Sequence, residues 1–153
     1  MKYPELNRAQ LRILPLAERM NKVKIEESYV PGDAQARALG THGSRVMETL
    51  LAHILEAKKN DKPVMLAFGA HSIKNGLGPV LIDLMEQGYL NHLATNGAGV
   101  IPDWEFAFQG ESSEDVQSNV EKGQFGIWQE TGYYINLAIN VGAYEGKGYG
   151  ESV

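Results

Sequence analysis

The sequence predicts an α/β fold in which a parallel sheet is flanked by helices, and three observations predict it. Residues 63–68 form a short apolar run without alternation, which is typical of a strand buried on both faces. Residues 90–95 read as a second strand, and the segments around both strands have helical periodicity. Helices and strands thus alternate with short connections, which is the pattern of a parallel sheet. We therefore expect a Rossmann-like domain over residues 31–153.

The first thirty residues are expected to form an N-terminal arm or helix. Leucines and isoleucines surround Pro15 without a regular period, and Val23 and Ile25 alternate with lysines. This pattern predicts a broken helix followed by a short extended piece. Basic residues also cluster here, and we interpret them as a solvated face or a subunit contact rather than a polyanion site. They are Arg8, Arg12, Arg19, Lys22 and Lys24.

Helical periodicity is clearest over residues 44–59, where apolar side chains fall on one face. The side chains on this face are Val46, Met47, Leu50, Leu51, Ile54 and Leu55. Another helix is expected from Leu77, with Pro79 in its first turn and Gly88 as its C-terminal cap. Residues 69–76 are too polar and glycine-bearing to continue the first strand, so we expect a loop there.

The downstream third is expected to contain two more helices. Ser112 and Asp115 have the spacing of a capping box, and apolar residues between 127 and 139 share a helical face. Four glycines between 142 and 150 predict a flexible end. A doubly wound sheet has about five or six strands, and only two are evident. We therefore expect a helix-rich, incomplete portion of a larger domain, truncated at its C-terminal side.

Composition restricts the classes of function. The 153 residues suffice for one domain with its own core, and the net charge of -5 disfavours binding to nucleic acid or anionic membranes. No run approaches the roughly 20 apolar residues of a membrane span, and residues 1–8 do not resemble a secretory signal. We therefore expect a soluble, cytoplasmic protein. The sequence has no GxSxG, Walker lysine, CxxC or HExxH motif, and its histidines fit no metal spacing.

Residues 95–99, Thr-Asn-Gly-Ala-Gly, follow the second predicted strand and precede a helix expected around residues 103–108. Ligands of parallel sheets bind at the carboxyl ends of the strands. The absent side chains of Gly97 and Gly99 would let a phosphate or ribose approach the backbone, and free amides of the next helix would receive anionic oxygens. These residues therefore indicate a nucleotide site, and a simple tight turn is the alternative.

The loop at residues 69–76 leaves the neighbouring strand at the same edge, so the two loops would form a crevice. His71 is a candidate to bond a ribose or to act as acid or base, or it merely caps the next helix. Asp103 and Glu105 are candidate ribose or cation partners. The aromatic residues around them would cover a cofactor ring or, as is commoner, pack in the core.

Residues 31–105 resemble the N-terminal part of deoxyhypusine synthase, with the match clearest from Asn75 to Asp103. The resemblance implies a Rossmann-like domain that uses NAD to take a hydride from spermidine, and then passes the aminobutyl group through an enzyme lysine to a translation factor. It also implies a homo-oligomer, a tetramer, with cofactor sites shared between subunits. The residues expected to contact NAD are Ala70, His71, Lys74, Asn75, Gly76, Thr95, Asn96, Gly97, Ala98 and Gly99, together with Asp103 as the ribose candidate.

The chain departs from this family at three points. The family's threonine-serine-asparagine loop is Gly69-Ala70-His71 here, and its pair of glutamates after the glycine turn is Ile101-Pro102. The family's later half, which carries the catalytic lysine, has no counterpart in these residues. No catalytic residue is therefore assigned, and the expected function is that of an NAD-binding domain of an enzyme acting on an amine or small metabolite.

Two alternatives remain. Residues 97–103 also resemble the glycine-alanine-glycine and isoleucine-proline-aspartate elements of sirtuins, which would imply an NAD-dependent deacylase. In sirtuins several residues separate the two elements, and zinc cysteines are present, whereas this chain has no cysteine. The other alternative is a non-catalytic assembly module whose helices bury a partner subunit.

Overall fold

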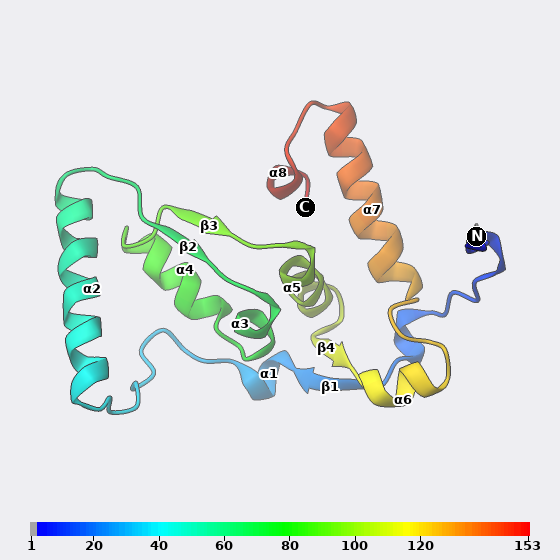
Figure 1. Cartoon of the computed structure of the whole chain (residues 1–153), viewed down its shortest axis with the longest axis horizontal. Coiled ribbons are helices and arrows are strands. Elements are labelled where there is room, and N and C mark those ends of the chain that lie inside the picture. The colour runs from blue at the N-terminus through cyan, green and yellow to red at the C-terminus, as the bar shows by residue number, and fades with distance from the viewer. Residues whose placement is uncertain (1–2) are drawn as a thin grey trace.

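The computed structural model describes residues 3–153 and shows a chain built mostly from helices, with two small sheets (Figure 1). Helices account for 54% of the chain and strands for 11%, so the helix-rich α/β class is confirmed. In chain order the elements are two 3-10 turns (Arg8–Gln10 and Leu16–Glu18), β1 (Asn21–Lys24), α1 (Ile25–Ser28), α2 (Thr41–Lys59), β2 (Met65–Ala67), α3 (Ala70–Lys74), α4 (Gly78–Glu86), β3 (His92–Ala94), α5 (Gly97–Gln109), β4 (Glu111–Glu114), α6 (Val116–Glu121), α7 (Gln129–Tyr144) and α8 (Tyr149–Ser152).

The two predicted strands form the parallel pair β2–β3, with Met65 opposite His92 and Ala67 opposite Ala94. Each strand is three residues long, shorter than the run that predicted it. Within residues 3–153 no further strand joins this pair, so a larger Rossmann-like sheet is not confirmed. Most of the other apolar residues recur at helical spacing and form helices instead.

The two helices predicted before and after β2 are present. α2 begins at Thr41 rather than Ser44, because Gly40 is its N-cap and the Gly40 carbonyl accepts from the Ser44 amide at 3.0 Å. α4 ends as predicted before Gly88, whose φ of 70° lies in the left-handed region that glycine tolerates.

Two predicted loops are wrong, because both are helix starts. The segment after β2 forms the short helix α3 rather than an open loop, and its following turn is closed by Gly76 at φ 76°. The glycine turn after β3 is itself the first turn of α5, which begins at Gly97 rather than near residue 103. The reason is Asn96, whose side chain caps the helix by accepting from the Gly99 amide at 3.2 Å.

The predicted capping box at Ser112 is also wrong. Ser112 lies inside β4, which pairs antiparallel with β1 and places Val23 opposite Ser112. The helix starts later, at Val116, because Asp115 is the N-cap and its carboxylate accepts from the Ser118 amide at 3.0 Å. The extended piece predicted near Val23 is confirmed, and this pairing ties the N-terminal segment to the chain after α5.

The glycine-rich end, expected to be flexible, contains the end of α7 and the short helix α8. Gly142 lies within α7, and α8 turns back so that Ser152 packs against Gly142, where a side chain would collide with it (Figure 1). The close approach of these two helices therefore requires a glycine at position 142.

The buried core is small and has two parts. One joins Leu14 and Leu16 of the N-terminal segment to Trp128, and the other joins Ile73, Leu81 and Phe106. Core packing is thus confirmed as the role of Phe106 and Trp128. By contrast α2, at the left edge of Figure 1, has no buried residue.

Among residues 3–153 no helix has both the length and the apolar character that a membrane span requires.

Candidate functional site

A cavity of about 410 Å³ lies beside the first turns of α3 and α5, and β4 and α7 complete its wall. Its lining includes Ala70 and Lys74 of α3 and Ala98 of α5, three of the residues expected to contact a cofactor. Because β2 and β3 run parallel and lead into α3 and α5, the cavity stands at the carboxyl end of the sheet.

The inner wall of the cavity is a buried ion pair between Arg19 and Glu105. The Arg19 guanidinium donates to both carboxylate oxygens of Glu105, at 2.8 and 2.6 Å. Glu105 also accepts from the hydroxyls of Ser112, at 2.7 Å, and Thr131, at 2.9 Å. Glu105 is only 1% exposed. It was a candidate ribose or cation partner, but its oxygens are already occupied, so its role is to join four segments of the chain.

Arg19 was expected to belong to a solvated face or a subunit contact, and the solvated face is wrong for that residue. Arg19 is 8% exposed, its Nε donates to Asn21 at 2.7 Å, and its guanidinium lies 5.6 Å from the centre of the Trp128 ring. Sequence reasoning missed the pair because the two partners are 86 positions apart.

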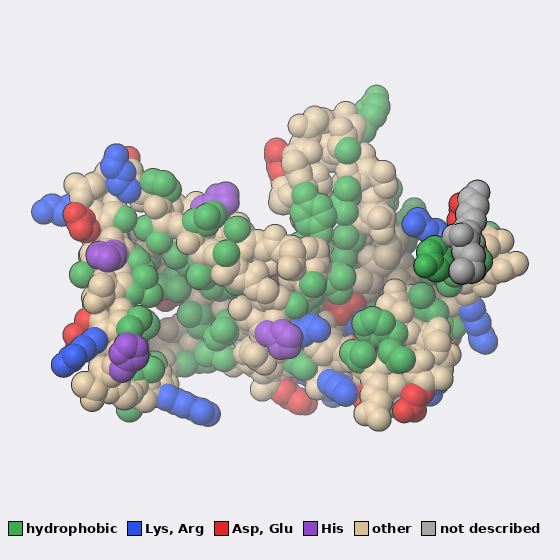
Figure 2. Space-filling view, in the orientation of Figure 1, with side chains coloured by type: hydrophobic (Ala, Val, Ile, Leu, Met, Phe, Trp, Pro, Cys, Tyr) green, Lys and Arg blue, Asp and Glu red, His purple; other side chains and the backbone are tan. Residues whose placement is uncertain are grey.

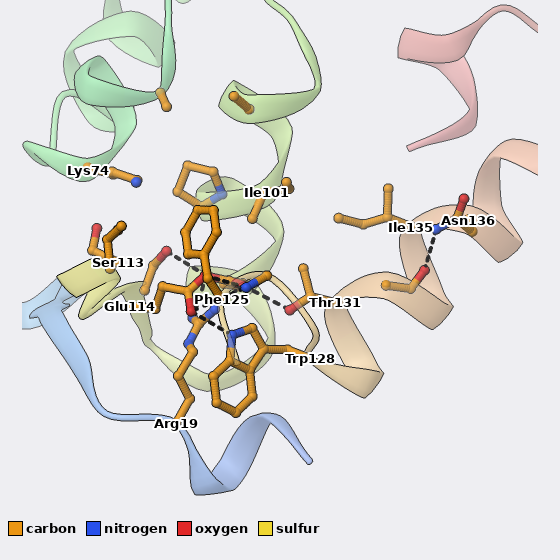
Figure 3. A pocket seen from close by; sticks show the side chains of 18 residues that line it. Arg19, Lys74, Ile101, Ser113, Glu114, Phe125, Trp128, Thr131, Ile135 and Asn136 are labelled. Carbon is orange, nitrogen blue, oxygen red and sulfur yellow. Dashed lines mark hydrogen bonds and ion pairs between the residues drawn. The ribbon is translucent and has the colours of Figure 1, made fainter. Parts of the chain in front are cut away.

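A second carboxylate, Glu114, is held at the cavity wall by three donors. Glu114 accepts from the Trp128 indole at 2.8 Å, a bond that is drawn in Figure 3, and also from the Asn119 amide at 2.8 Å and the Gly126 backbone at 3.2 Å. These bonds fix the loop between α6 and α7 against β4. Glu114 was not predicted from the sequence, since β4 itself was not expected.

Ser113 lies between Ser112 and Glu114, whose side chains are both hydrogen-bonded, and it adopts a strained backbone conformation. Its φ is 67°, in the left-handed region that non-glycine residues seldom occupy. Its hydroxyl oxygen is buried and has no hydrogen-bond partner within the described residues, yet Ser113 lines the cavity. Strain and an unsatisfied polar atom are both commoner at binding sites than elsewhere.

Lys74 supplies a cation at the opposite side of the cavity. Its amine is directed toward the cavity in Figure 3, and it belongs to no ion pair among residues 3–153. Apolar side chains, including Ile101, Phe125 and Ile135, make up much of the remaining lining (Figure 3). An apolar cavity with a few polar groups at its edges is the usual form of a small-molecule site.

The first turn of α5 offers unpaired backbone groups beside this cavity. Gly97 and Ala98 are exposed, and their amides have no acceptor within the described residues. Pro102, four positions after Ala98, has no N–H, so the Ala98 carbonyl lacks its helical donor. The backbone at Ala98 can therefore both donate to and accept from a ligand.

The remaining predicted residues are divided among other places. Thr95 and Asp103 line a separate hollow of about 630 Å³ on another side of α5, next to Tyr149. A Cβ at Gly97 would lie 3.5 Å from the hydroxyl of Tyr149, so Gly97 is next to a residue that lines this hollow without lining it itself. Asn96 is the cap of α5, and Gly99 is buried against the side chain of Thr95.

His71, Asn75 and Gly76 are not brought to the cavity. His71 and Asn75 are exposed on α3 and its C-terminal cap, and neither lines the 410 Å³ cavity. Gly76 is buried, with its backbone against the Ser28 carbonyl, which gives it a role in chain packing. Ile101 and Pro102, the positions at which the sequence departs from the deoxyhypusine synthase pattern, do line the cavity.

Comparison of the chain with known protein families, curated proteins and solved structures found no match. We therefore infer a function from the geometry of the site itself.

Proposed function

We propose that this protein binds a dinucleotide such as NAD in the 410 Å³ cavity and is the NAD-binding part of a deoxyhypusine synthase-like enzyme acting on an amine or small metabolite. The observation that carries the proposal is the position of the cavity, where the carboxyl end of β2–β3 meets the free amides of α5 and the unpaired Lys74. Helix N-termini and lysines are both favourable partners of phosphate oxygens.

The two sides of the cavity suit different parts of such a ligand. Lys74 and the Ala98 amide would hold a pyrophosphate, and the Ala98 carbonyl left free by Pro102 would accept from a ribose hydroxyl. The apolar wall with Phe125 would cover a base or nicotinamide ring. The buried Arg19–Glu105 pair is neutral overall and would not oppose an anion.

The carboxylates of the cavity wall differ from the family's pattern. Glu105 is neutralised by Arg19, Glu114 is held by neutral donors, and Ile101 and Pro102 occupy the positions of the family's glutamate pair. A polycation such as spermidine would therefore lack the two counter-ions of that pair, so we propose a smaller or less charged metabolite as the reaction partner.

Calorimetric titration with NAD tests the proposal. The wild-type chain should release or absorb heat with a one-to-one stoichiometry, and Lys74→Ala should weaken affinity roughly 10- to 100-fold, the range expected for one charged hydrogen bond. Lys62→Ala, which removes an exposed lysine away from the cavity, is the matched control and should bind as the wild type does. Absence of heat with all three proteins, and no rise in melting temperature with excess NAD, would refute the proposal.

A second candidate, the assembly module, is favoured by one observation. α2 carries an apolar stripe in which no side chain is buried by the described chain; its members are Val46, Met47, Leu50, Leu51, Ile54 and Leu55. This function requires no nucleotide, so a large particle mass without any NAD response would favour it over the first.

A further inference from the structure

The apolar face of α2 is the largest feature of the fold that nucleotide binding does not explain. The helix has 19 residues and none of them is buried. Its large aliphatic side chains are about half exposed: Val46 52%, Met47 50%, Leu50 48%, Leu51 52% and Leu55 46%. In the view of Figure 2, hydrophobic side chains are visible over this helix. Because a helix of this length derives most of its stability from packing its apolar face, α2 requires a partner surface.

The total exposed area of the chain indicates the size of that partner surface. A compact monomer of this mass exposes roughly 7,700 Å², whereas this chain exposes 11605 Å². The surplus is about 3,900 Å², and the exposed segments 3–13 and 31–40 contribute part of it. A standard interface covers only about 800 Å² on each partner. The surplus is therefore ample for a permanent interface that includes α2.

We propose that α2 is a dimerisation helix, and that its occupant is α2 of a second copy of this chain. The two helices would run antiparallel about a twofold axis that passes between Leu50 and Leu51. Such an axis sets Leu50 against Leu51, Met47 against Ile54 and Val46 against Leu55. The stripe thus meets itself, as an isologous interface requires.

The absence of charge from the stripe suits it to pairing two identical chains. Each copy has a net charge of -5, which opposes association through any surface, and an interface without acidic side chains adds no close-range repulsion to it. The six apolar positions of the stripe contain no charge. Lys58, at one end of the stripe, is turned back to its own chain, where its amine donates to the Gln87 carbonyl at 2.5 Å and lies 4.2 Å from the centre of the Tyr89 ring.

The proposal is independent of nucleotide binding, because α2 does not line the 410 Å³ cavity. Light scattering after size exclusion should give twice the 16.8 kDa mass of the chain, with or without NAD. Leu51→Glu should return the mass to 16.8 kDa, while circular dichroism of the remaining helices verifies the fold. A wild-type chain that runs at 16.8 kDa over a tenfold concentration range would overturn the proposal.

Cysteine cross-linking locates the interface without depending on a destabilising variant. The chain has no cysteine, so Leu50→Cys introduces a single thiol close to the proposed axis. Mild oxidation should convert most of this variant to a covalent dimer. Ala52→Cys, on the opposite face of the same helix, is the matched control and should stay uncross-linked. Equal cross-linking of both variants, or of neither, would show that α2 does not pair in this way.

Discussion

Removal of the Glu105 carboxylate should destabilise the protein more than any other single change at the cavity. Glu105→Ala leaves the buried Arg19 guanidinium without its partner and deprives Ser112 and Thr131 of their acceptor. Breaking a buried pair in this way costs roughly 3–5 kcal/mol. For a chain of this length that corresponds to a fall in Tm of about 6–20 °C.

The matched control is Glu111→Ala on the neighbouring strand. Glu111 pairs with Lys24 at 3.9 Å, and the two side chains are 40% and 58% exposed, so its loss should cost at most about 1 kcal/mol. Urea denaturation at one protein concentration, with both variants fitted to a common slope, gives the two free energies of unfolding. If Glu105→Ala unfolds within about 1 kcal/mol of Glu111→Ala, the buried network does not hold the N-terminal segment to α5 as we describe.

Two further predictions concern local conformation. Gly76→Ala should destabilise clearly more than Gly146→Ala: both positions have positive φ, costing about 1–2 kcal/mol for a side chain, but only at Gly76 would the new Cβ collide with the Ser28 carbonyl. Urea midpoints of the two variants measure this, and equal midpoints would contradict the described packing. The pKa of Asp115 is held below its ordinary value of 3.8 by the Ser118 amide and then by Lys22. The ionised Asp115 carboxylate therefore stabilises the folded protein above pH 3.8, and this stabilisation is lost as the carboxylate is protonated at lower pH. The wild type should accordingly lose stability relative to Asp115→Asn as the pH falls from about 5 to about 3. Parallel pH profiles of the two proteins would show that the carboxylate does not contribute.

The elements that the sequence predicted well are those that a local pattern specifies. α2 follows from a long apolar periodicity, and α4 from Pro79 and Gly88 at its two ends. β2 follows from an apolar run and β3 from the strand expected at residues 90–95, although their ends do not, because strand length depends on the neighbouring strand. The predicted cofactor residues lie in different places because the start of α5 lines the cavity at Ala98, whereas Gly97 lies beside Tyr149.

The parts that could not be predicted depend on contacts between distant segments. β4 has the sequence Glu-Ser-Ser-Glu, which has no apolar alternation, and it is a strand because β1 pairs with it. Its side chains bond to partners outside the strand, Ser112 to Glu105 and Glu114 to Trp128, which are 7 and 14 positions away. No local propensity encodes such pairings. The start of α5 was predictable in principle, because Asn96 is a favourable cap, but the glycines after it suggested a turn.

A crystal structure of the protein soaked with NAD would test the central claim most directly. We predict that a phosphate oxygen lies within hydrogen-bond distance of both the Ala98 amide and the Lys74 amine, with an aromatic ring of the ligand beside Phe125. Nucleotide bound instead in the hollow next to Tyr149, or a cavity without ligand at an NAD concentration that saturates the protein in solution, would contradict this account.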